Sequence, residues 1–191
     1  MSTPELRALI EAGELTTALD LLYRHHAAEV RRFLEFRVAA AAVDDLVQEV
    51  WAAVLEGLPR FRGDCRPEVW LKAIAHHRLV DHLRRQRAHD TLDSQLVAAA
   101  GLGSALGLKQ PTRPTTRIDR ERRAQALQEA LAQLDAEERE LLALRFVDGL
   151  KPAEIVRVLG SSDNPNTVSQ RLVRLCRRLR ARLEDQIKPP R

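Results

Sequence analysis

The apolar residues of this chain recur at helical spacing, and this pattern constrains the fold more than any other feature of the sequence. One helical face is formed by Val43, Leu46, Val47, Val50, Trp51, Val54, Leu55 and Leu58. Asp44 and Asp45 stand near its start, where the helix dipole favours acidic side chains. Similar patterns cover Leu15–Val38 and a segment from Pro67 to about Arg87. No strand-like alternation is found, so the sequence predicts an all-α fold.

A change of composition separates a second helical region from the first. From His89 to about Thr116, glycine, alanine, threonine and proline replace the periodic pattern, which is typical of a flexible linker. Helical periodicity returns near Ile118. We therefore expect two small helical domains, residues 1–88 and 118–191, joined by a flexible linker over residues 89–117.

Capping residues divide the second region into helices. Asp135 gives a start typical of a capping box for a helix that ends near Gly149. A short helix is expected over Pro152–Leu159. Thr167 is a favourable N-cap and predicts the start of the last helix.

The last helix is expected to have one apolar and one basic face. The apolar face consists of Val168, Leu172, Leu175, Leu179 and Leu183. The basic face consists of Arg171, Arg174, Arg178 and Arg182. A helix of this kind, preceded by a short helix and a turn, is typical of a helix-turn-helix that enters the major groove of DNA.

Charge is distributed unevenly along the chain. Residues 1–58 hold five basic residues against ten acidic ones, residues 60–87 hold eight against three, and residues 166–183 hold six arginines and no acid. Two basic surfaces, one in each domain, indicate two contacts on one long polyanion. The alternative is that these arginines only solvate helix faces, as most charge runs do.

Several classes of protein do not fit the sequence. Cys65 and Cys176 lie far apart without histidines at ligand spacing, so neither a disulfide framework nor a zinc site is indicated. The longest apolar stretch, residues 96–108, is shorter than the ~20 residues that cross a bilayer. No basic segment leads into an apolar one near the N-terminus, so we expect a cytoplasmic protein without a signal peptide.

Several segments resemble bacterial RNA polymerase sigma factors of the extracytoplasmic-function group. The first domain resembles conserved region two of this family over Asp45–Trp51, Phe61–Gly63, Trp70–Ala75 and Asp81–Arg85. The second is similar to region four over Leu134–Phe146, Gly149–Leu150, Glu154–Ile155 and Thr167–Arg174. The motifs follow the family order over about residues 15–185, and this ordered combination is more specific than any single motif.

The resemblance implies a transcription initiation factor rather than an enzyme. Such a factor binds core RNA polymerase, directs it to promoter DNA and helps to melt the downstream promoter element. We expect no catalytic residue, metal or cofactor, no membrane contact, and a monomer when the chain is free. Whether an anti-sigma factor is a further partner is left open by the sequence.

The resemblance also assigns residues to three contacts. Core polymerase would bind Asp45, Leu46, Gln48 and Glu49. The downstream element would meet Phe61, Arg62, Asp64, His76, His77, Asp81, Arg84 and Arg85. The upstream element would meet Thr167, Ser169, Gln170, Arg171, Arg174, Arg177 and Arg178.

The residue types suit these contacts. Capture of an unstacked base needs an aromatic shelf and a cation, which Phe61 and Arg62 supply. Gln170 can pair with adenine, and Arg171 or Arg174 can reach guanine or phosphate. Arg177 and Arg178 are expected to contact phosphates, which position a protein without specifying sequence.

The sequence departs from the family pattern at three places. His77 stands where the family usually has asparagine, and Pro67 stands where it has an aromatic residue. The turn from Gly160 to Thr167 is longer than is usual in the family. These departures bear on promoter choice rather than on the class of protein.

Two other classes of protein share part of this pattern. A stand-alone helix-turn-helix regulator would use residues 117–185 for DNA and residues 1–87 for dimerisation or a ligand, and would bind duplex DNA tightly by itself. A free sigma factor would bind promoters poorly, because a flexible linker makes simultaneous contact with two distant sites entropically costly. A metal-dependent hydrolase would need a cluster of His76, His77, Asp81, His82 and His89–Asp90, which lacks a second ligand pair at suitable spacing.

Overall fold

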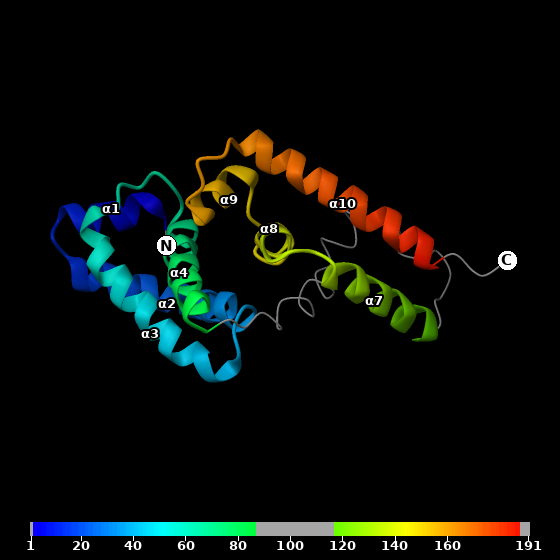
Figure 1. Ribbon diagram of the computed structural model, residues 1–191. Helices are drawn as coiled ribbons and strands as arrows, with labels where there is room; N and C mark the ends of the chain where they lie inside the picture. Colours follow the sequence, from blue (N-terminus) through cyan, green and yellow to red (C-terminus); the bar gives the residue numbers. More distant parts are fainter. Residues whose placement is uncertain (1, 87–116, 188–191) are drawn as a thin grey trace. The chain divides into compact units, whose positions relative to one another are not determined.

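The structure, a computed structural model, describes residues 2–86 and 117–187, without the side chains of residues 85–86, 117–124 and 184–187. Every regular element in these ranges is a helix, which confirms the all-α prediction (Figure 1). Contacts divide the chain into two compact units, Met1–His89 with Val156–Ser162 and Asp90–Ile155 with Asp163–Arg191. The expected linker lies almost wholly outside the described residues, and the expected domain bounds stay a prediction.

The first unit contains a three-helix core with one additional helix. Its N-terminal elements are α1 (Thr3–Glu11), α2 (Leu15–Glu35), α3 (Ala40–Gly57), the 3-10 helix η1 (Leu58–Arg60) and α4 (Pro67–Gln86). Helices α2, α3 and α4 each pack against the other two, and α1 packs on α2. The apolar stripes of these helices meet in a core that includes Leu22, Phe33, Leu46, Val50 and Leu71.

Helix α1 was not expected from the apolar pattern. A capping box begins it, because the Ser2 hydroxyl accepts from the Glu5 N–H at 3.4 Å and the Glu5 carboxylate accepts from the Ser2 N–H at 2.8 Å. Leu6 is fully buried and anchors the helix to the unit. The Ser2-to-Glu5 spacing was therefore a sequence signal for this helix.

Helix α3 begins at Ala40 rather than near Val43, so the acidic pair lies in its second turn. Asp44 forms an ion pair with Arg31 of α2 and joins the two helices at the surface. Leu55, the seventh residue of the apolar pattern, is 51% exposed, so this helical face is not buried along its whole length.

The C-terminal part of the chain contains four helices within the described residues. These are α7 (Arg117–Ala132), α8 (Ala136–Phe146), α9 (Pro152–Leu159) and α10 (Pro165–Ile187). Helix α10 packs along α7 and also contacts α8 (Figure 1). The expected cap of α8 is confirmed, because the Asp135 carboxylate accepts from the Glu138 N–H at 2.8 Å.

The last helix begins at Pro165, before the expected N-cap Thr167. The Asn164 side chain accepts from the Asn166 N–H at 2.9 Å, and the fixed φ of proline suits the first helical position. The connection between α9 and α10 therefore spans only residues 160–164. The apparent extra length of the turn is taken up by the first turn of α10.

Candidate functional site

The expected polymerase contacts divide between the surface and the core of the first unit. Asp45 and Gln48 are exposed on one side of α3, and Glu49 lies half-buried beside them. Leu46 is fully buried, so the expectation that it contacts a partner directly was wrong. Its side chain completes the apolar stripe of α3 and holds the exposed residues in place.

The structure adds exposed apolar atoms near these polar residues. Leu55 lies seven residues after Gln48, which places both on the same side of α3. On α2, Tyr23 is 52% exposed, and its ring centroid lies 4.9 Å from that of Trp51. Sequence analysis missed Tyr23 and Leu55 as surface residues, although Tyr23 lies on the outward side of the α2 pattern.

The loop between η1 and α4 carries the first downstream-element candidates. Arg62 and Asp64 are exposed, whereas Phe61 is 8% exposed with its ring centroid 5.0 Å from that of Trp70. The expectation of an open aromatic shelf at Phe61 was therefore wrong. The ring packs against Trp70 in the first turn of α4, and this contact anchors the start of the loop in the unit.

Helix α4 presents a line of polar side chains to solvent. His77, Asp81 and Arg84 follow one another at helical spacing, and the Arg84 guanidinium lies 4.0 Å from the Asp81 carboxylate. His76 is only 9% exposed because it faces the core side of α4, so its placement on this surface was wrong. The Arg85 side chain lies outside the described residues.

One cation of the basic 60–87 segment is internal. The Lys72 side chain is 6% exposed, and its Nζ lies 2.6 Å from Oε1 of Glu29 on α2. The His26 imidazole, 3.5 Å from the other carboxylate oxygen, and the Lys72 ammonium hold the pKa of Glu29 down to about 2. Lys72 therefore joins α4 to α2 and does not belong to a nucleic-acid surface.

Helix α10 is amphipathic as the sequence predicts, but of the four arginines expected on its basic face Arg174 and Arg178 are exposed, whereas Arg171 and Arg182 are half-buried. Its apolar face is buried in the second unit: Val168, Leu172, Leu175, Leu179 and Leu183. Gln170, Arg174 and Arg177 are exposed on the opposite side, and Thr167 is exposed in the first turn. Within residues 166–183, which contain no acidic residue, the helix therefore presents an amide and two guanidinium groups on its exposed face.

Acidic side chains hold two of the other arginines on one flank of α10. Arg171 lies 3.6 Å from a Glu137 carboxylate oxygen and 3.8 Å from one of Asp163. Arg178 forms an ion pair with Glu138, in the first turn of α8. Both guanidinium groups stay partly exposed, so these pairs fix the arginines without removing them from solvent.

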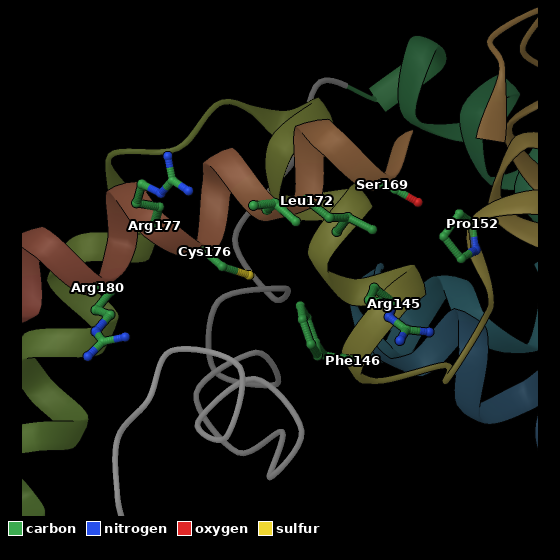
Figure 2. A pocket seen from close by; sticks show the side chains of 9 residues that line it. Arg145, Phe146, Pro152, Ser169, Leu172, Cys176, Arg177 and Arg180 are labelled. Carbon is green, nitrogen blue, oxygen red and sulfur yellow. The ribbon is translucent and has the colours of Figure 1, made fainter. Parts of the chain in front are cut away.

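The other flank of α10 borders a hollow of about 460 Å³. Figure 2 shows it between the end of α8, which contributes Phe146, and α10, which contributes Ser169, Cys176 and Arg177. Burial raises the pKa of the Cys176 thiol. Val173, 57% exposed, lines the same hollow and was missed because it lies outside the leucine stripe.

The described residues hold no group of three or more histidine, cysteine, aspartate and glutamate side chains that could bind a metal ion. His89 and Asp90, which belong to the alternative of a metal-dependent hydrolase, lie outside them. No helix in the described ranges is long and apolar enough to cross a membrane.

Family models match both units. Residues 22–89 match the family described as Sigma-70 region 2, and residues 124–179 match the family described as Sigma-70, region 4. The first match contains α3, the 61–66 loop and α4, and the second contains α8, α9 and most of α10. The order of the two matches agrees with the order of the motifs.

Relatives cover nearly the whole chain. The ECF RNA polymerase sigma factor ShbA of Streptomyces griseus is 36% identical over 185 residues, which cover 90% of each chain. The ECF RNA polymerase sigma factor SigM of Mycobacterium tuberculosis is 30% identical over 184 residues, which cover 95% of this chain and 83% of the relative. The solved structure of CnrH in complex with the cytosolic domain of CnrY shares the fold, with a TM-score of 0.58 at 23% identity over 94% of this chain and 96% of that chain. The chain therefore belongs to the ECF RNA polymerase sigma factors, which direct RNA polymerase to initiate transcription at specific promoters.

Proposed function

We propose that this sigma factor works through three separate surfaces, one for core RNA polymerase and two for promoter DNA. The observation that carries the proposal is α10, where a buried leucine stripe faces the unit and Gln170, Arg174 and Arg177 face solvent. An amide and guanidinium groups on one exposed helix face suit the edges of base pairs and the phosphates beside them.

Core polymerase binds the exposed side of α3 in this proposal. Asp45, Gln48 and Glu49 provide an acidic and polar patch that suits a basic helical partner. Leu55 and Tyr23 add apolar area near this patch, and desolvated apolar anchors supply much of the affinity of a protein interface. Leu46 contributes from the core by fixing the helix.

The downstream promoter element meets the 61–66 loop and the outer line of α4. Arg62, His77 and Arg84 supply donors for the backbone of an opened strand, with Asp64 and Asp81 beside them. Arg85 is assigned to the same surface from the sequence. Phe61 and His76 support this surface from inside the unit.

The upstream element meets α10 in the major groove. Gln170 and Arg174 read base edges, while Arg177 and Thr167 contact phosphates. Ser169 lies on the flank beside the hollow and reaches the backbone at the groove edge. Arg171 and Arg178 contact phosphates after exchanging their acidic partners for DNA.

The partners in this proposal are core RNA polymerase and promoter DNA, and the chain acts in the cytoplasm as a monomer until it joins the polymerase. It performs no reaction of its own. An anti-sigma factor is a third class of partner, in line with the complex of the similarly folded CnrH with the cytosolic domain of CnrY.

Charge reversal on α3 tests the polymerase surface. The double variant Asp45→Arg/Gln48→Arg should lose association with core polymerase and run-off transcription while its helicity by circular dichroism is unchanged. Glu14→Arg, a reversal at an exposed residue before α2, should behave like the unmodified protein. Co-purification of the double variant with core polymerase at normal levels would refute the assignment.

A binding experiment separates the sigma factor from a stand-alone regulator. The free chain should bind promoter duplex weakly, and addition of core polymerase should produce a specific complex. Tight, sequence-specific binding of duplex DNA by the free chain would favour the regulator.

A further inference from the structure

Helix α1 contacts the loop that the proposed function assigns to the downstream promoter element. The Thr3 hydroxyl donates to the Cys65 carbonyl oxygen at 3.4 Å. Thr3 and Arg7 of α1 and Gly63 of the loop line a shallow hollow between the two segments. In Figure 1 the chain that leads into α4 passes beside α1. The loop is therefore supported by a helix that precedes the matched family region, residues 22–89.

Gly63 is the loop residue that a side chain of α1 approaches most closely. Its φ of +76° lies in the left-handed region, which glycine adopts without the steric cost that a Cβ adds. A Cβ at this position would lie 2.5 Å from Cδ of Arg7 and 3.2 Å from Cγ2 of Thr3. The backbone conformation therefore favours glycine here, and a Cβ would displace the Arg7 stem.

The Arg7 side chain makes this contact with its stem. Its guanidinium lies 2.6 Å from the Glu11 carboxylate one turn later on α1. The methylene stem lies against Gly63, as long charged side chains commonly cover a surface with their stems while the head stays in water. Leu6, fully buried, fixes α1 itself.

We propose that α1 is a positioning element for the 61–66 loop, in which the Arg7 stem and Thr3 hold the Gly63 turn in the conformation that receives the opened promoter strand. The role of the loop in this statement rests on the proposed function. The positioning contact itself concerns only the chain, so the two can be tested separately.

The reactivity of Cys65 measures the position of the loop in the absence of DNA. Labelling of the full-length chain by a maleimide, followed residue by residue by mass spectrometry, should be about tenfold faster at Cys65 in Gly63→Ala and Arg7→Ala than in the unmodified chain. Arg7→Met, which keeps an unbranched stem without the charge, should label at the normal rate. Cys176 in the second unit is the internal reference and should not change.

A second glycine, Gly13, separates the effect of backbone strain from that of the contact with Arg7. Gly13 has a φ of +79°, and a Cβ added there would meet no atom within 4 Å, so Gly13→Ala introduces the same backbone strain without touching the loop. Cys65 in that variant should label at the normal rate. Equal acceleration in Gly13→Ala and Gly63→Ala, or no acceleration in either Gly63→Ala or Arg7→Ala, would overturn the positioning role.

Promoter opening tests whether the contact between α1 and the 61–66 loop matters for the proposed function. With core polymerase bound, Gly63→Ala and Arg7→Ala should lower permanganate reactivity of the melted strand about fivefold on duplex promoter and much less on a pre-opened template, while Arg7→Met restores it. Arg62→Ala is the reference for the loop. A loss in Arg62→Ala without one in the α1 and Gly63 variants would refute only the positioning role, whereas no loss in Arg62→Ala would refute the assignment of the loop.

Discussion

Helices α4 and α10 both come from basic segments of the sequence, yet they use their cations differently. In α4, the Lys72 side chain is 6% exposed and ion-paired with Glu29 of α2. In α10, Arg171 and Arg178 pair with acidic residues while their side chains stay 39% and 45% exposed. Lys72 therefore belongs to the interior of the first unit, whereas Arg171 and Arg178 belong to the surface of the second.

This difference shows that a count of basic residues does not measure a nucleic-acid surface. A buried ion pair cannot exchange its carboxylate for a phosphate without opening the core, and removal of one partner leaves an uncompensated charge. A pair at the surface contributes little to stability and can be exchanged, because water and salt already screen it. Loss of a cation should therefore cost much more stability in α4 than in α10.

Substitution of Lys72 should have the largest effect on stability. Lys72→Met keeps the stem but removes the ammonium group from Glu29, and should lower the free energy of unfolding by about 2 kcal/mol in urea titrations, less than for a fully buried pair because Glu29 is 31% exposed. Arg178→Met should cost less than about 1 kcal/mol. A similar loss in both variants would remove the distinction between the two helices.

A base-substitution scan should separate the residues on the exposed face of α10. Arg174→Ala should weaken promoter binding by the polymerase complex by about 1 to 3 kcal/mol and relax preference at one base pair. Arg177→Ala should weaken binding to all sequences alike and lower the salt slope by about one ion. If neither Gln170→Ala nor Arg174→Ala changes preference at any position, α10 is not the sequence reader.

Acid should weaken the first unit through Glu29. Its pKa in the folded chain, about 2, lies below the ordinary value of 4.5, so its carboxylate stabilises the unit above pH 4.5 and this contribution is lost as the pH falls from 4.5 toward 2. Glu29→Gln should remove about 1 kcal/mol of this acid dependence, because about a third of the side chain still meets water. The measurement is the free energy of unfolding at several pH values in that window. An unchanged acid dependence would show that the ion pair contributes nothing there.

Sequence reasoning found the helices whose boundaries carry strong local signals. Pro152–Leu159 was predicted with its observed bounds because proline favours the first helical turn and glycine follows the last. The start of α10 was wrong because Asn164 and Pro165 are an equally good cap and first residue, located before Thr167. Capping rules allow α10 to begin after Asn164 or after Thr167, and they do not decide between the two.

The site was harder to predict because exposure depends on tertiary packing. Leu46 and Leu55 occur in one apolar pattern, but packing against α2 and α4 buries the first and leaves the second in solvent. Phe61 suits a stacking role by residue type, yet its contact with Trp70 connects the loop to the next helix. The ion pairs of Lys72, Arg171 and Arg178 likewise join different helices, so no spacing rule reveals them.

The smallest effect, and the most direct test of exchangeable pairing, is expected from Glu138. Glu138→Gln removes the partner of Arg178 and a negative charge near the proposed DNA surface, so promoter affinity of the polymerase complex should rise by about 0.5 kcal/mol, most clearly at low salt. Glu137→Gln is the comparison and should raise the affinity less, because the Glu137 carboxylate is 86% exposed and lies 3.6 Å from Arg171. Both substitutions weaken the favourable charge at the start of α8, so circular dichroism must show that α8 remains folded. A fall in affinity with Glu138→Gln would mean that the acid orients Arg178 for DNA rather than competing with it.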